Sequence, residues 1–290
     1  SIEFKDVLKM GRTQLQDAVP MTLGQEFKTF AVMIDADIFK LRDVQAHLRE
    51  VNLGATAIGT GINSKAAYQR KVISNLREVT GVDYIAAGDL IEATQDTGSF
   101  VHISGMLKSV AIKISKICND LRLLSSGPRA GFNEINLPPL QPGSSIMPGK
   151  VNPTQSEAMT MVAVQVMGNN TTIGIAASQG NFELNVFKPV IALNILQSIR
   201  LLSDTMIAFN DNCAIGIEPN LVNINKYLND SLMLVTALNP YIGYEKAAHI
   251  AKTAHKNGTT LKQEAVNLGI LSQEEFDSYV KPENMIKPSL

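Results

Sequence analysis

Apolar side chains recur at steps of three and four residues along most of the chain, which is the period of an amphipathic α-helix. The first stripe runs from Leu23 to Val51 and predicts a helix roughly 45 Å long. Two more long helices are predicted at 154–178 and 186–213, and the second is apolar almost all round, as is typical of a helix enclosed by others. A fourth stripe alternates steps of four and three, like the contact seam of a helical bundle, and consists of Ile103, Leu107, Val110, Ile114, Ile117, Leu121 and Leu124.

Glycine and proline interrupt this helical pattern at two places. The glycine-rich turn at 54–61 leads into a shorter helix predicted around 65–80, and a proline-rich connection follows Gly127. Both interruptions indicate inserts between long helices.

A change in helix length near 216–220 predicts a domain boundary. Beyond it the periodic segments are short, for example at 244–256 and 272–280. We therefore predict an all-α fold. Residues 1–217 are expected to form an elongated long-helix bundle, and residues 218–290 a small C-terminal helical domain.

Composition and charge exclude several classes of protein. The chain has 290 residues, of which 45% are hydrophobic and 18% charged, and its formal net charge is −1. Near-neutral charge without a basic tract argues against nucleic-acid binding. No apolar run reaches the roughly 20 residues of a membrane-spanning helix and no signal peptide precedes the first helix, so we expect a cytoplasmic protein with no membrane partner. Cys118 and Cys213 lie in apolar helical patterns, which favours buried free thiols.

The segment 143–153 carries the clearest candidate chemistry. It reads Gly-Ser-Ser-Ile-Met-Pro-Gly-Lys-Val-Asn-Pro, and its glycines and prolines favour a loop. Lys150 and Asn152 can hold a carboxylate, and a serine beside them can touch the same small molecule. Thr154 and Glu157 fit a capping box, which predicts a helix N-terminus that favours anions directly after the loop. Together these features predict a site for a small carboxylate.

The positive groups of such a loop can stabilise negative charge on a bound carboxylate, including charge that develops during a reaction. On spacing alone, a solvated Lys150 and a turn-forming Asn152 explain the pattern equally well. Glu157 would likewise need no role beyond capping the helix.

A second segment, 11–26, reads Gly-Arg-Thr-Gln-Leu-Gln-Asp-Ala-Val-Pro-Met-Thr-Leu-Gly-Gln-Glu. Together with 143–153 it resembles the fumarase/aspartase superfamily, whose members eliminate a group from the carbon next to a carboxylate-activated C–H. The resemblance covers essentially the whole chain. It implies a small dicarboxylate substrate and a homotetramer whose active sites are shared between subunits. No Glu-x-x-His pair is present and the two cysteines are far apart in sequence, so we predict neither a cofactor nor a catalytic metal.

The resemblance also implies roles for individual residues. Ser144 would be the base that abstracts the proton, and Ser145, Lys150, Asn152 and Thr13 would bind the substrate. A hydroxyl is a poor base unless its oxyanion is stabilised, which loop amides and Lys150 would do. A third substrate-binding segment of the family, rich in Ser, Thr and Asn, is not found in this chain.

Gln14 is the informative departure from the family pattern. Fumarases carry histidine at this position, hydrogen-bonded to a glutamate that matches Glu157, whereas several aspartases carry glutamine. A glutamine cannot titrate, so it positions a group by hydrogen bonds only. By resemblance the chain is aspartase-like up to about residue 142 and fumarase-like after Asn152.

We therefore expect a lyase that converts L-aspartate to fumarate and ammonia, with Ser144, Gln14 and Glu157 as its catalytic residues. The alternative is a fumarate hydratase, which converts L-malate to fumarate and water. A third interpretation is a catalytically inactive helical scaffold or fragment, which the missing family segment favours.

Overall fold

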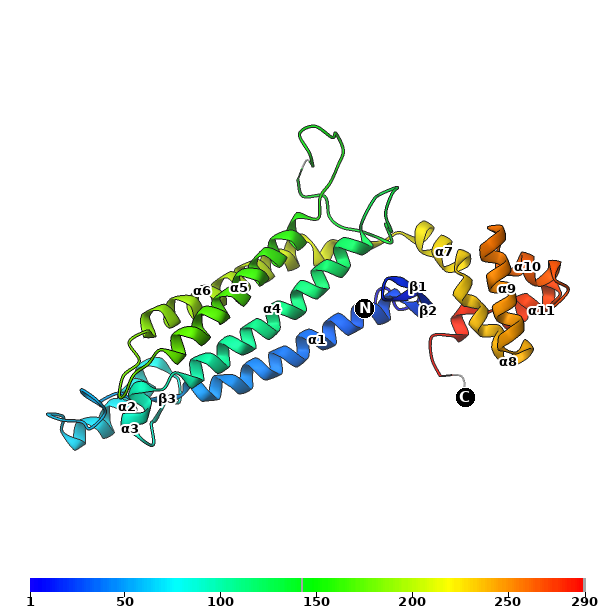
Figure 1. The fold of residues 1–290 in the computed structure, drawn as a ribbon. Coiled ribbons are helices and arrows are strands. Elements are labelled where there is room, and N and C mark those ends of the chain that lie inside the picture. Colours follow the sequence, from blue (N-terminus) through cyan, green and yellow to red (C-terminus); the bar gives the residue numbers. More distant parts are fainter. Residues whose placement is uncertain (142, 289–290) are drawn as a thin grey trace. The chain divides into compact units, whose positions relative to one another are not determined.

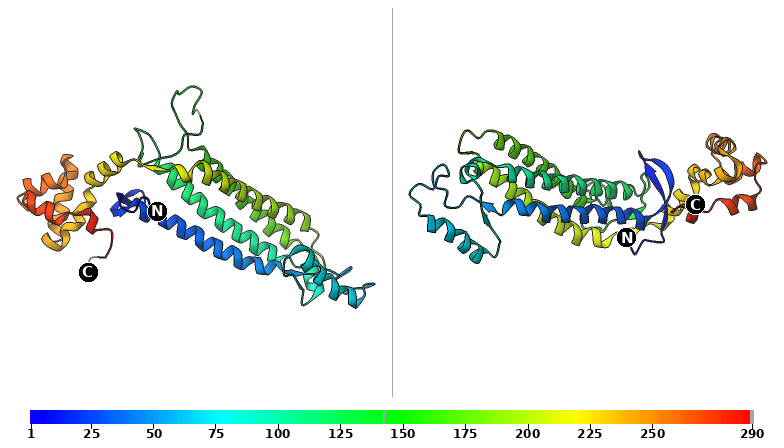
Figure 2. Two further views of the ribbon diagram at one scale, coloured as in Figure 1. Left: turned by 180° about the vertical axis from the view of Figure 1, so that it is seen from behind. Right: turned by 90° about the horizontal axis from the view of Figure 1, so that it is seen from below.

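Four long helices lie side by side in the computed structural model, which describes residues 1–141 and 143–288 (Figures 1 and 2). They are α1 (Leu23–Val44), α4 (Gly98–Leu124), α5 (Thr154–Ser178) and α6 (Lys188–Asn212). The shorter helices are α2 (Ala66–Thr80), α3 (Leu90–Gln95), α7 (Leu221–Asp230), α8 (Asn239–Ile242), α9 (Tyr244–Asn257), α10 (Leu261–Asn267) and α11 (Gln273–Tyr279). The predicted all-α class is confirmed.

The strands are short and pair two by two. The first pair is an antiparallel hairpin, the second is parallel and the third is antiparallel. The pairs are β1 (Leu8–Thr13) with β2 (Gln16–Thr22), β3 (Glu50–Val51) with β4 (Ile85–Ala86), and β5 (Ile135–Asn136) with β6 (Glu218–Pro219).

The chain folds into two compact units, each assembled from separate stretches. The bundle unit comprises residues 32–122 and 137–216, and the hairpin unit comprises residues 1–31, 123–136 and those from 217 onward. The division into 1–217 and 218–290 stays a prediction about domains. It differs from these units because two early stretches of chain pack with the C-terminal helices.

The core of the bundle unit joins all four long helices. Its buried cluster draws Val44 from α1, Ile103 from α4, Ile173 from α5 and Ile191 from α6. Each fully buried side chain of this kind stabilises the fold by about 1.5–3 kcal/mol. A buried hydrogen bond also joins two of these helices, because Asn169 Nδ2 on α5 donates to Ser198 Oγ on α6 at 3.0 Å. This bond restricts the relative orientation of the two helices.

The core of the hairpin unit is formed mainly by the C-terminal helices. Met10 of β1 is 1% exposed and packs in the same cluster as Leu228, Leu238, Ile250 and Phe276. The hairpin is therefore anchored in this core through its own strand.

Helix positions agree closely with the sequence pattern. The segments predicted at 154–178 and 186–213 are α5 and α6. The helix predicted from Leu23 to Val51 is shorter, because α1 ends at Val44. Residues Glu50 and Val51 pair with β4 instead, so tertiary pairing overrides the helical period there.

The two cysteines are buried and free, as predicted. Burial raises the pKa of the Cys118 thiol to about 12, so this thiol stays protonated at neutral pH.

The prediction that α6 is enclosed is wrong for this chain. Leu193 and Leu196 are 65% and 66% exposed, and Ile207 is 60% exposed. The segment Lys188–Gly216 is also long and apolar enough to cross a membrane by length and composition, unlike our expectation, although core helices of bundles meet the same criterion. Part of the apolar surface of α6 is therefore not covered by other residues of the chain.

Candidate active site

The motif at 11–26 comprises the end of β1, the turn of the hairpin, β2 and the first residues of α1. Thr13 pairs with Gln16 across the hairpin, which leaves Gln14 and Leu15 as a two-residue turn. Both turn residues have positive φ, 54° and 63°. This combination is required by a type I′ turn, which normally selects Asn and Gly. The turn is therefore conformationally strained, and the rest of the hairpin must hold it.

Thr13 and Gln14 are exposed at this tip, as is Leu15, whose side chain is 64% exposed. Non-glycine residues in the left-handed region cost of order 1–3 kcal/mol each and persist where the surroundings fix them. Two adjacent polar side chains are thus presented to solvent on a constrained turn.

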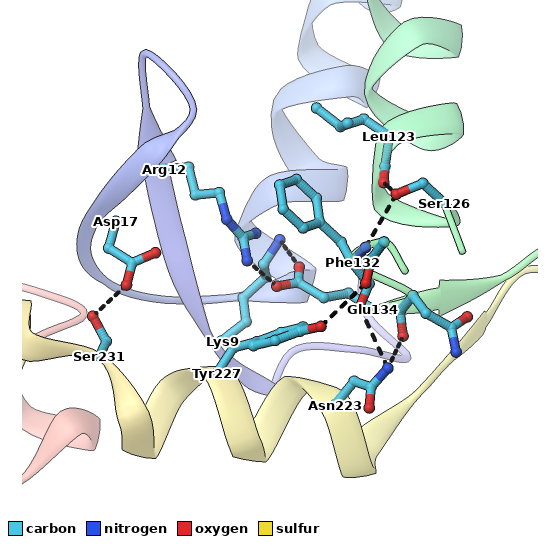
Figure 3. A network of polar contacts seen from close by, with 12 residues as sticks. Lys9, Arg12, Asp17, Leu123, Ser126, Phe132, Glu134, Asn223, Tyr227 and Ser231 are labelled. Atoms are coloured by element: carbon cyan, nitrogen blue, oxygen red, sulfur yellow. Dashed lines mark hydrogen bonds and ion pairs between the residues drawn. The ribbon is translucent and has the colours of Figure 1, made fainter. Parts of the chain in front are cut away.

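A buried network of charges involves residues of β1 (Figure 3). Glu134, which is 0% exposed, accepts a hydrogen bond from Arg12 Nη2 at 2.6 Å through Oε1. Its other oxygen, Oε2, lies 2.9 Å from Nζ of Lys9, which is itself 1% exposed. Lys9 Nζ also donates to Glu26 Oε2 at 2.6 Å. Two cations and two carboxylates therefore balance one another inside the hairpin unit.

Aromatic rings and backbone groups surround Arg12 in this network. Its guanidinium carbon lies 4.4 Å from the ring centroid of Phe132 and 5.9 Å from that of Tyr227 on α7. Tyr227 Oη donates to the carbonyl oxygen of Gly131 at 3.2 Å, and Asn223 Nδ2 donates to the carbonyl oxygen of Asn133 at 3.1 Å (Figure 3). These bonds fix residues 131–134 against α7.

The ionisation of Glu134 follows from these contacts. Burial alone raises the pKa of this carboxyl, but the hydrogen bond from Arg12 and the charge of Lys9 outweigh burial. The pKa of Glu134 therefore lies below its ordinary value, and the carboxylate is ionised at neutral pH.

The second group of predicted residues lies on the loop before α5. Ser144 is half-buried, and its Oγ accepts a hydrogen bond from the amide of Ile146 at 3.2 Å. The ends of the loop approach so closely that a Cβ on Gly143 would lie 0.9 Å from the carbonyl oxygen of Lys150. Only glycine fits at this point of closure.

The side chains of Ser145, Lys150 and Asn152 are exposed on this loop. Within the part of the chain that the structure describes, none of the three side chains has a hydrogen-bond partner. They are therefore available to a bound molecule.

The predicted capping box is wrong. Helix α5 begins at Thr154 with Pro153 as its N-cap, and no side chain caps it. Because the helix starts at Thr154 itself, this residue cannot act as the cap. Glu157 instead lies 3.8 Å from Arg122 Nη2, with both side chains partly exposed.

The predicted site residues thus form two groups. Thr13 and Gln14 belong to the hairpin unit, while Ser144, Ser145, Lys150, Asn152 and Glu157 belong to the bundle unit. Each group is therefore described within its own unit. Among residues 1–141 and 143–288, no three His, Cys, Asp or Glu side chains gather to hold a metal ion.

Sequence reasoning missed the charges beneath the hairpin. Arg12 lies inside one of the two motifs, but Glu134 is 122 residues away and nothing local marks it as its partner. The signal in the sequence was the pair of cations Lys9 and Arg12 on either side of Met10, in a strand whose centre is buried.

Comparison with known proteins assigns the chain to a family. Residues 1–168 match the family model described as "Lyase", and residues 234–287 match "Fumarase C C-terminus". The chain belongs to the fumarase/aspartase superfamily.

Several relatives of the chain are named as fumarate hydratases. The chain is 56% identical over 98% of its length to fumarate hydratase class II of Pasteurella multocida, and it covers 61% of that protein. It is 51% identical to mitochondrial fumarate hydratase of Mus musculus, covering 99% of this chain and 57% of the mouse protein. The crystal structure of class II fumarase from Schistosoma mansoni superposes with a TM-score of 0.95 at 38% identity, over 100% of this chain and 64% of that one. The chain thus spans less than two thirds of these relatives.

These relatives overturn our preference for an aspartate ammonia-lyase. The similarity to fumarate hydratases extends over 283 residues, so it includes the front half that we interpreted as aspartase-like. The preference depended mainly on Gln14, and a single position carries less information than the whole chain.

We predict that Leu15→Gly stabilises the hairpin unit. Glycine adopts positive φ without the steric penalty of a side chain, so the free energy of unfolding should rise by about 1 kcal/mol. Leu15→Ala is the matched control, since it also removes the exposed side chain but keeps a Cβ at φ 63°. Chemical denaturation measures both variants, and equal stability of the two would contradict strain in the turn.

We predict that Glu134→Gln destabilises the protein by about 3–5 kcal/mol at pH 7, because Lys9 and Arg12 lose their shared carboxylate. The folded-state pKa of Glu134 is lowered, so the stabilisation is complete above the unfolded value of about 4.3 and is lost as the pH falls through the lower, folded value.

Urea titrations from neutral to acidic pH measure this difference, which should shrink on acidification. Glu157→Gln is the control, because its ion pair with Arg122 is partly exposed and is worth less than about 1 kcal/mol. A difference that is constant with pH would contradict an ionised, buried Glu134.

Proposed function

We propose that this chain is part of a fumarate hydratase, which interconverts L-malate and fumarate by removing or adding water. The observation that carries the proposal is 56% identity to a fumarate hydratase class II over 98% of the chain. The loop before α5 supports it, because Lys150 and Asn152 are exposed beside two serines.

In this proposal the loop binds and deprotonates the substrate. Lys150, Asn152 and Ser145 hold a carboxylate and stabilise the charge that develops on it when the neighbouring carbon loses its proton. Ser144 Oγ, as an oxyanion, accepts that proton. The hydroxyl group of malate then leaves from the adjacent carbon as water, with a proton taken up from the solvent, and Ser144 returns its proton to the solvent afterwards.

In the proposed homotetramer, the hairpin of one subunit contributes two further residues to an active site that subunits share. Thr13 binds a substrate carboxylate, and Gln14 positions the leaving or attacking water by hydrogen bonding. Gln14 cannot take part in proton transfer itself. Glu157, which belongs to the bundle unit, is the carboxylate among the proposed site residues, and it lies 3.8 Å from the Arg122 guanidinium.

The proposal includes a homotetramer with shared active sites. Helix α5 has one charged residue in 25, Glu157, yet a stripe of its surface is exposed. Met161 is 70% exposed, Val164 67% and Ile175 60%. An exposed apolar stripe of this length favours burial against further copies of the chain.

The first test is an assay of the complete protein with L-malate and L-aspartate, followed by the ultraviolet absorbance of fumarate. We expect fumarate from malate and none from aspartate. Ser144→Ala should lower kcat by about 10²–10⁴-fold, because it removes the base. Ser178→Ala, at the far end of α5, is the matched control and should leave kcat unchanged. Product from aspartate alone would refute the proposal.

A second test concerns the turn. Gln14→His introduces a group with a pKa of about 6.5, which can exchange a proton with water during the reaction. We expect kcat for malate to rise by about tenfold or more, together with a new limb in the pH–rate profile near that pKa. An unchanged profile would show that residue 14 takes no part in the water chemistry.

A third test concerns assembly. Val164→Lys places a charge on the exposed apolar stripe of α5 and should reduce the mass in sedimentation experiments to that of smaller species, with loss of activity. Asn75→Lys, on an exposed polar position of α2, adds the same charge and should leave the tetramer intact. A tetramer that survives Val164→Lys would place the subunit interface elsewhere.

A further inference from the structure

The tip of the hairpin needs support, because its two turn residues both have positive φ. The structure holds the tip at one residue pair. Arg12 of β1 and Asp17 of β2 are cross-strand partners, one pair below the pair that flanks the turn. Each of them is bonded to a group outside the hairpin.

The first attachment is the bond between Arg12 and Glu134. The guanidinium donates to a carboxylate that is 0% exposed, and it lies over the ring of Phe132 at 4.4 Å. A planar guanidinium restricts both distance and direction, unlike the point charge of a lysine. Arg12 is thus held in position and in orientation.

The hairpin is irregular where a second cation of β1 reaches the same carboxylate. Met10 pairs with Pro20 but Arg12 pairs with Asp17, so β2 carries one extra residue at this point. A bulge of this kind bends the strand and increases the twist. Lys9 and Arg12, three residues apart, would face opposite sides of a regular strand, yet both reach Glu134.

The second attachment is on the opposite strand. Ser231 Oγ, just after α7, donates to Asp17 Oδ2 at 2.8 Å (Figure 3). Two hydrogen bonds therefore hold the turn, one on each strand. Both of them join the hairpin to segments that pack with α7.

We propose that Arg12 and Asp17, held by Glu134 and Ser231, are positioning residues that fix the turn and thereby aim Thr13 and Gln14 at the substrate. This inference rests on the proposed fumarate hydratase function. Neither Arg12 nor Asp17 touches the substrate. Both act through the residues of the turn.

The test begins with Arg12→Lys, which keeps the charge but loses the planar fork and its contact with Phe132. A displacement of about 1 Å at a reacting centre can cost 10²-fold, so we expect kcat/KM for malate to fall by about that factor. Ser231→Ala is a milder variant that removes only the second attachment, and it should lower kcat/KM less.

A double-variant cycle separates positioning from a general loss of structure. If Arg12 acts through Thr13 and Gln14, then adding Arg12→Lys to the combined Thr13→Ala/Gln14→Ala variant should slow it by no more than about threefold. Two effects that multiply independently would overturn the proposal.

The stability control uses a different buried ion pair. Lys113→Met in the bundle unit strips the partner from Asp37, which is 2% exposed, and should lower the melting temperature without changing kcat/KM. If Lys113→Met reduces kcat/KM as much as Arg12→Lys does, the effect of Arg12 is only structural.

A readout without turnover keeps this proposal separate from the proposed function. Hydrogen exchange of the backbone amides of 13–17 should become faster in Arg12→Lys and stay unchanged in Lys113→Met. Faster exchange in a protein that does not act on malate would refute the proposed function, but it would still support the role of Arg12 in fixing the turn. Unchanged exchange in Arg12→Lys would show that Arg12 does not fix the turn and would overturn the proposal.

Discussion

A carboxylate that is fully buried stays ionised only when positively charged groups lie next to it. Glu134 is such a carboxylate, and the hairpin unit must place cations beside it. Glu134 lies just before β5 in the chain, while its two cationic partners, Lys9 and Arg12, lie on β1. Aromatic rings from Phe132 and Tyr227 close around Arg12. Three stretches of chain therefore satisfy one electrostatic condition together, and the position of the hairpin follows from it.

The bundle unit depends on a different physical balance. Its helices meet mainly through apolar contacts, the amide of Asn169 forms a hydrogen bond between α5 and α6, and the ion pair of Lys113 with Asp37 joins α4 to α1. Polar groups gather instead where the chain leaves a helix, as in the loop from Gly143 to Asn152. Long apolar helices give the fold its rigidity, and the segments between them carry the chemical groups.

The sequence pattern located the helices because a helix is a local structure with a fixed period. Helix α5 was predicted at its observed bounds. The hairpin was not predicted, because Lys9 is a charged residue in a buried strand and its partner Glu134 is remote in sequence. The capping pattern at Thr154 failed because the helix starts at that residue. The substrate preference failed because it gave one side chain, Gln14, more weight than the chain around it.

The bond between Asp17 and Ser231 also has a consequence for how the protein is made. The two residues are 214 positions apart. A hairpin forms by itself within about 10 μs, but a ribosome adds roughly 5–20 residues per second, so Ser231 emerges about 10–40 s after Asp17. During that interval Met10 lacks the C-terminal helices that bury it. The first motif of the chain therefore reaches its final form late in synthesis, and a nascent chain that stops before residue 231 never completes it.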